Sequence, residues 1–401
     1  MHMNNNNKTA LVPRLRFPEF AINGAINFET GDVIFEPISN KNHNSDLPVL
    51  AITQEHGAIP RDQIDYNVSV TDKSLESYKV VEIGDFIISL RSFQGGIEYS
   101  LYHGICSPAY IILRKRVPIV DQYYKHYFKT GRFIQDLIKD LEGIRDGKMV
   151  SYSQFSAIML PKPDRKEQQK IADCLSSIDD LITAEDKKLE ALGAHKKGLM
   201  QKLFPAEGKT LPEWRFPEFI DCDEWEKKTL IDICNMQAGN YVSATEIDEN
   251  RASDTFPCYG GNGMRGYTKT FTHNGKYPLI GRQGALCGNV TLVEGAFHAT
   301  EHAVVCTPSQ RVVVEWLYYQ LVMMNLNQYA TGQAQPGLSV KVLEKLQVKV
   351  PSNTKEQQQI ADCLSCVDDL ITEQAKKIEA LKTHKKGLMQ GLFPSIEEVG
   401  E

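Results

Sequence analysis

The chain has 401 residues and a formal net charge of −6 at pH 7, a length that accommodates two or three domains with cores of ordinary size. The N-terminus is polar and no apolar stretch approaches the roughly 18 residues that cross a membrane, so we expect a soluble, cytoplasmic protein without a membrane span. The negative charge argues weakly against nucleic acid, but local basic surfaces bind phosphate whatever the overall charge.

The nine cysteines follow no disulfide or zinc-cluster spacing, which is typical of reduced, packed thiols. Cys363 and Cys366 form a lone CxxC pair, whose counterpart earlier in the chain is Cys174 with Ser177. No second pair of ligands lies near it in the sequence, so we expect no metal site there.

Residues 1–160 are predicted to form a first mixed α/β domain. From about residue 21, short β-branched and aromatic runs alternate with Gly, Pro and Asn, and residues 121–141 are expected to contribute short helices. Arg91, Ser92 and Gln94 precede two glycines in this segment. Arg pairs well with guanine and Gln with adenine, so this loop is a candidate for base contact, and a solvated Gly-rich turn is the alternative.

A long helix is predicted in residues 161–205 and again in residues 351–401. Residues 166–205 return as residues 355–394 with 30 of 40 positions identical, and each copy is free of proline until its last residue. The pentapeptide RFPEF occurs at 16–20 and again at 215–219, ahead of each copy. The chain therefore consists of two tandem halves that share a framework and differ in the segments between.

Apolar residues recur in each predicted helix at alternating spacings of three and four, which is typical of a coiled-coil seam. The stripe is interrupted in both copies at equivalent positions, Glu185 or Gln374 and Lys196 or Lys385. The seam residues are Ile171, Leu175, Ile178, Ile182, Leu189, Leu192, Leu199 and Leu203 in the first copy, and Ile360, Leu364, Val367, Ile371, Ile378, Leu381, Leu388 and Leu392 in the second.

Charge along the repeat favours antiparallel pairing of the two helices. Each copy is acidic in its first half and basic in its second half, an order that also suits the helix dipole. Parallel pairing would place like charges together, whereas antiparallel pairing sets each acidic half against a basic half. We therefore predict a pseudo-twofold antiparallel coiled coil with the variable domains at opposite ends.

Residues 206–350 are predicted to form a second mixed α/β domain, which differs in length and sequence from the first. Its candidate base-reading residues are Arg282 and Gln283, between two glycines, with Tyr259, Asn262 and Arg265 as neighbours. A solvated turn is again the alternative. The fold class is thus α+β, with two recognition-type domains separated by two long helices.

Three sequence patterns resemble catalytic motifs, but none has the structural context that its chemistry requires. GNGMRG at 261–266 fits a dinucleotide pattern, but no helix start follows it. HATEH at 298–302 fits a zinc-protease pattern, but it lies in a strand-like context that separates the two histidines. Gly208, Lys209 and Thr210 lack the first glycine of a P-loop. We expect no catalytic residue, metal or cofactor in this chain.

The repeated motifs EQQKIAD and EQQQIAD, SIDDLIT and CVDDLIT, HKKGLMQ and the terminal LFP, with RFPEF before each variable segment, resemble the DNA-specificity subunit of Type I restriction-modification systems. This resemblance implies a non-catalytic subunit that reads a split, asymmetric double-stranded DNA sequence, one half per domain. It also implies that the helices set the spacer and dock two modification (methyltransferase) subunits. S-adenosylmethionine and ATP would then belong to the modification and restriction subunits.

Three alternatives remain open at the level of sequence. A coiled-coil adaptor could use its variable domains to bind protein, in which case duplex binding would be absent. An enzyme with an unrecognised site would bind S-adenosylmethionine by itself. An orphan specificity subunit would support methylation without restriction.

Overall fold

The structure, a computed structural model, describes residues 12–44, 46–64, 75–139, 150–284, 286–332 and 336–394. Contacts divide the chain into two compact units, Met1–Glu185 with Lys377–Glu401 (unit 1) and Asp186–Lys376 (unit 2). Each unit therefore combines one variable segment with part of both long helices. The predicted α+β class, with two mixed domains and two long antiparallel helices, is confirmed.

Unit 1 is built on a four-stranded antiparallel sheet in the order β2-β9-β6-β7. These strands are Phe35–Ile38, Ile111–Lys115, Phe86–Ile88 and Glu98–Tyr99 in that order. Three strand pairs accompany it: β1 (Asn27–Thr30) with β10 (Met159–Lys162), β3 (Leu50–Thr53) with β4 (Gly57–Pro60), and β5 (Lys79–Val81) with β8 (Gly104–Cys106). The short helices are α1 (Gly31–Ile34), α3 (Ser92–Gly95), α4 (Asp121–Tyr127), α5 (Gly131–Ile138) and α6 (Tyr152–Ala157), with 3₁₀ turns at Pro18–Asn23 and Arg61–Gln63.

The helical segment expected at 121–141 is two helices because the chain turns at Thr130. The Thr130 hydroxyl accepts a hydrogen bond from the Phe133 backbone N–H (3.3 Å), which caps α5. Residues 140 and 141 lie outside the described part of the chain. Both helices bury aromatic side chains in a core shared with Phe35, Phe86 and Phe155, which are fully buried.

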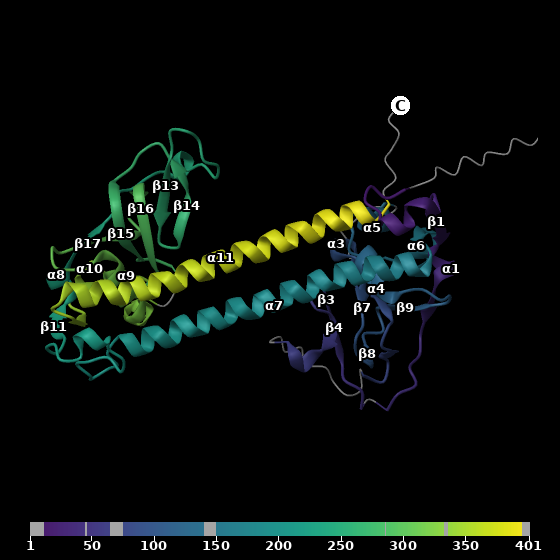
Figure 1. Ribbon diagram of the computed structural model, residues 1–401, viewed down its shortest axis with the longest axis horizontal. Helices are drawn as coiled ribbons and strands as arrows, with labels where there is room; N and C mark the ends of the chain where they lie inside the picture. The colour runs from purple at the N-terminus through teal and green to yellow at the C-terminus, as the bar shows by residue number, and fades with distance from the viewer. Residues whose placement is uncertain are drawn as a thin grey trace, which may run out of the picture. The chain divides into compact units, whose positions relative to one another are not determined.

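Unit 2 contains a six-stranded sheet in the order β12-β17-β15-β16-β13-β14 (Figure 1). These strands are Cys234–Ala238, Ala303–Pro308, His273–Gly281, Val290–Ala299, Phe256–Gly260 and Gly263–Thr268 in that order. The pairing of β13 with β16 is parallel and the other ladders are antiparallel. A strand pair joins β11 (Glu226–Thr229) to β18 (Gln347–Val350), and the helices are α8 (Leu230–Ile233), α9 (Val314–Met323) and α10 (Val340–Leu343), with 3₁₀ turns at Pro217–Phe219, Ala244–Glu246 and Leu326–Tyr329.

The two long helices are α7 (Arg165–Leu203) and α11 (Thr354–Leu392), and in each unit part of one lies beside part of the other (Figure 1). In unit 1, α11 Lys385 pairs with α7 Asp179 (2.5 Å) and Lys377 with Glu185 (2.6 Å). In unit 2, α7 Lys196 pairs with Asp368 of α11 (2.6 Å). Residue numbers rise on one helix as they fall on the other, so the predicted antiparallel direction and charge pairing are confirmed.

The repeated EQQ motif at the start of each long helix anchors the variable segment to the helix. Gln168 accepts a hydrogen bond from the Val120 backbone N–H (2.9 Å) and donates to Pro163 O (2.8 Å). Gln357 accepts from the Val313 N–H (2.9 Å) and donates to Pro351 O (2.9 Å). The equivalent glutamine of each repeat therefore fixes the start of a short helix, α4 in unit 1 and α9 in unit 2.

The RFPEF motif is fastened to the same helix turn. Arg16 forms two hydrogen bonds with the Glu167 carboxylate (2.7 and 2.8 Å), and Arg215 forms the same pair with Glu356 (2.7 and 2.8 Å). Both carboxylates are 1% exposed. The short repeat and the long repeat are therefore linked in each half of the chain, since each RFPEF motif is bound to the long helix that follows it.

The ends of the predicted seam have a second role. Ile171, Leu175 and Leu392 belong to the core of unit 1, and Leu203, Ile360 and Leu364 belong to the core of unit 2. The middle of the seam includes Val367 and Ile378, which are buried, and partly exposed positions. The helix ends thus complete the globular cores, which is why the apolar stripe extends beyond the stretch needed for a coiled coil.

Candidate nucleic-acid interface

The first candidate loop follows β6 and contains the one-turn helix α3. Gly96 ends this helix with a φ of +81°, and a Cβ there would lie 1.9 Å from Phe128 O, so glycine is required. Ser92 is 1% exposed, and its hydroxyl accepts a hydrogen bond from the Ser89 N–H (2.9 Å). Arg91 and Gln94 are exposed. The loop therefore presents Arg91 and Gln94 to solvent, while Ser92 holds its backbone.

The second candidate loop follows β15 and is held by backbone hydrogen bonds on both sides. The Arg282 N–H donates to His302 O (2.9 Å), and Arg282 O accepts from the Leu338 N–H (2.8 Å). Gly281 packs on the turn between β13 and β14, where a Cβ on Gly281 would lie 2.0 Å from Gly261 O. This close approach of two glycines brings Gln283 next to the Asn262 turn.

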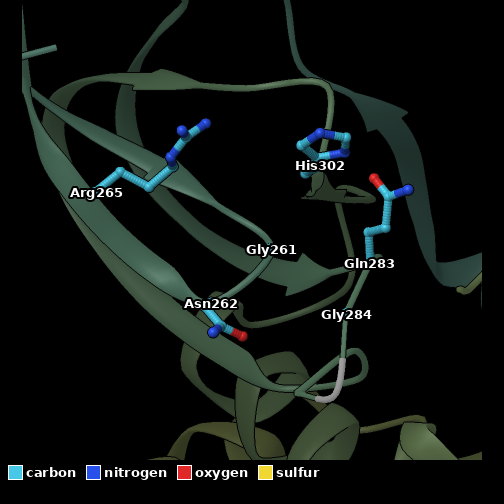
Figure 2. A pocket seen from close by; sticks show the side chains of 6 residues that line it. All are labelled: Gly261, Asn262, Arg265, Gln283, Gly284 and His302. Atoms are coloured by element: carbon cyan, nitrogen blue, oxygen red, sulfur yellow. The ribbon is translucent and has the colours of Figure 1, made fainter. Parts of the chain in front are cut away.

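A hollow of about 310 Å³ forms where these two turns meet, and Figure 2 shows the residues that line it. Gln283 and His302 lie next to each other, with Arg265 across the hollow from them. The lining residues are Gly261, Asn262, Arg265, Gln283, Gly284 and His302. Three of the predicted residues, from segments about twenty positions apart, therefore converge on one open recess.

A second hollow of about 420 Å³ shares Gln283 and His302 with the first and is also lined by Arg282 and Glu301. Glu301 lies 3.3 Å from the His302 imidazole. Arg265, Arg282 and the amides of Asn262 and Gln283 supply donors, while Glu301 and the amide oxygens supply acceptors. This is the set of groups that distinguishes base edges by hydrogen bonding.

Tyr259 is not part of this recess. Its ring packs edge-on against Phe297 at 6.0 Å, and burial raises the pKa of its hydroxyl. Its predicted contact with DNA stays a prediction, with no support from its position. His302 and Glu301, which line the hollows, were not among the predicted residues, because their HATEH segment was considered only as a zinc pattern.

The two histidines of HATEH have different surroundings. His298 is 5% exposed and its ring nitrogens lie 2.9 Å from Thr270 Oγ1 and 3.2 Å from Asn240 O, so it serves the packing of the sheet. Over the described ranges, no group of three or more His, Cys, Asp or Glu side chains could hold a metal ion. Within those same ranges, no helix is both long and apolar enough to cross a membrane.

The sequence matches the Type I restriction modification DNA specificity domain over residues 18–194 and 222–383. It is 51% identical over 130 residues to the Type I restriction enzyme EcoprrI specificity subunit of Escherichia coli, a match that spans 32% of each chain. It is 25% identical over 358 residues to the MjaVIII specificity subunit of Methanocaldococcus jannaschii, covering 81% of each chain. The fold is similar to the S subunit of the Type I system of M. genitalium, with a TM-score of 0.61, 18% identity and coverage of 96% of this chain and 100% of that one.

Proposed function

Because this chain belongs to the family of Type I restriction-modification DNA specificity subunits, we propose that it reads an asymmetric DNA sequence in two separate halves, one half per unit. Specificity subunits are the non-catalytic, DNA-recognising components of these systems. We assign one half of the target to the recess in unit 2 and the other half to the α3 loop in unit 1. The main support for the proposal is the recess in unit 2, where Asn262, Arg265 and Gln283 converge on a backbone held by hydrogen bonds.

Rigid support favours base reading over a solvated turn. A side chain on a fixed backbone loses less conformational freedom when it contacts a base, which lowers the free-energy cost of association. The backbone of Arg282 is fixed on both sides, and the Gly261 and Gly281 turns lock together. In unit 1, the α3 loop offers Arg91 and Gln94 from a different framework. Because the candidate loops of the two units differ in sequence and framework, we expect them to recognise different half-sequences.

The repeated face of the long helices supports docking of two modification subunits. Leu181 is 43% exposed and Leu370, at the same repeat position, is 52% exposed. The same apolar side chain thus faces solvent in both copies, so one kind of partner surface can contact each of them. In this proposal S-adenosylmethionine and ATP bind the modification and restriction subunits, and the complex acts on DNA in the cytoplasm.

The proposal is tested by replacing Arg282 and Gln283 with alanine in the complex with a modification subunit and sequencing the methylated adenines. We expect relaxed selection in one half of the target, because each lost bidentate base contact reduces discrimination by about 1–3 kcal/mol. The other half should be unchanged. Arg251→Ala, an exposed arginine outside the recess, is the matched control. Unchanged selection in both halves would show that this loop does not read DNA.

A further inference from the structure

A cavity of about 680 Å³ lies in unit 1, and one of its lining residues, Lys129, donates a hydrogen bond to Gly95 O (3.0 Å) at the end of the first candidate loop. It is formed by the end of α4, the start of α5, the N-terminal segment and the last turns of α11. Its cationic side chains are Arg14, Lys129, Arg132, Lys382, Lys385 and Lys386. Met389 and Phe393 contribute apolar surface, and none of the described lining residues is acidic.

The positive charge of this cavity is only partly neutralised. Four of the cations form ion pairs with acidic residues that do not line the cavity. These pairs are Lys129 with Glu98, Lys385 with Asp179, Arg132 with Asp136, and Lys382 with Glu379 (3.3 Å) on the exposed helix surface. Within the described ranges, no ion pair involves Arg14 or Lys386. An anionic ligand would therefore meet two cations that have no acidic partner among the residues that the structure describes.

The corresponding region of unit 2 has fewer cations: Lys196 and Lys197 stand where α11 has Lys385 and Lys386, but other cationic positions of unit 1 are not repeated. PRLRFPEF at 13–20 aligns with PEWRFPEF at 212–219, so Glu213 stands where unit 1 has Arg14. In the long repeat, Gly193 stands where α11 has Lys382. The segment after α9, residues 324–329, contains no charged residue, whereas Arg132 follows α4 in unit 1. The excess of cations is thus built into one half of the chain.

We propose that this cavity binds an acidic peptide segment of a partner, one per chain, with carboxylates facing Arg14 and Lys386 and an apolar side chain against Met389. The volume suits a few residues, since small-ligand sites occupy about 300–1,000 Å³, and a duplex is too wide to enter. The apolar surface among the cations favours a peptide over a bare phosphate. A partner that docks through the repeated helix face can bind twice, whereas this site distinguishes the two halves.

The test measures binding of a fluorescein-labelled Glu-Glu-Leu-Glu-Glu peptide to the full chain by fluorescence anisotropy, with Gln-Gln-Leu-Gln-Gln as the uncharged probe. We expect one acidic peptide per chain and binding that weakens with salt. Arg14→Glu with Lys382→Ala makes unit 1 resemble unit 2 and should weaken the affinity at least about tenfold. Arg251→Glu with Lys355→Ala changes the net charge equally at exposed positions elsewhere and should leave it unchanged.

Equal affinity for both peptides, or an affinity that the Arg14 and Lys382 substitutions leave intact, would overturn the proposal. Two peptides per chain would overturn its asymmetry. A random duplex that is bound through the same two residues, and that the acidic peptide fails to displace, would assign the site to phosphate instead. Circular dichroism checks folding of the double variant, and Lys386→Ala provides the same readout if the double variant unfolds.

Discussion

The buried ion pairs that fasten RFPEF to the long helices allow a matched test of the repeated framework. Arg16→Met leaves the Glu167 carboxylate, 1% exposed, without its two hydrogen bonds from the guanidinium. Removing one partner of a buried pair costs about 3–5 kcal/mol, because an uncompensated charge remains in the interior. In unit 2 the Trp225 indole N–H also donates to Glu356 (3.1 Å), so Arg215→Met should cost about 1 kcal/mol less.

Hydrogen exchange measured by mass spectrometry resolves the two helix starts in one sample. A cost of about 3 kcal/mol corresponds to roughly a hundredfold faster exchange at the start of α7 in the Arg16→Met variant, with the start of α11 unchanged. Arg16→Met combined with Glu167→Leu should restore most of the protection, because an apolar pair of similar volume carries no desolvation cost. Acceleration of less than about fivefold, or equal acceleration in both helices, would refute this reasoning.

Three further outcomes are expected. Burial lowers the pKa of His126 from 6.5 to about 4. Below pH 6.5 the unfolded chain therefore binds more protons than the folded chain, so the free energy of unfolding falls as the pH decreases, by about 3 kcal/mol in total. His126→Tyr, which copies Tyr319 at the equivalent position, should flatten this pH dependence in urea unfolding, and an unchanged slope would contradict the assignment. Leu364→Ala should cost about 3 kcal/mol because the side chain is fully buried, whereas Leu370→Ala should change stability by less than about 0.5 kcal/mol, and equal costs in thermal unfolding would contradict the assigned burial. Inserting one repeat unit into both long helices should lengthen the spacer between half-sites without changing their sequences, and a constant spacer in the methylated sites would rule out a ruler.

The two long helices could be predicted from the sequence because the segment that forms them occurs twice. The 3-4 spacing from Ile171 onward and the acid-first charge order were sufficient for the antiparallel helices. The function of Gln168 and Gln357 was beyond sequence, because their partners Val120 and Val313 lie more than forty residues away in segments that share no motif. Their repetition was the available signal.

The candidate site could be predicted only in part. Arg282 and Gln283 stood out because glycines flank them, and Asn262 and Arg265 because they are polar residues near that loop. His302 was missed since its approach to Gln283 depends on the β15–β17 register and the Gly261–Gly281 packing. Ser92 looked like a contact residue, yet its hydroxyl is used inside the loop. Side-chain direction in irregular loops follows from such tertiary contacts and not from residue type.

The central claim is that this chain selects a two-part DNA sequence, and sequencing of methylated adenines in cells that express it with a modification subunit tests that claim most directly. We predict methylation within two different short sequences held at one constant spacing, absent when this chain is omitted. Methylation at a single palindrome, at random positions, or at the same sites without this chain would contradict the account.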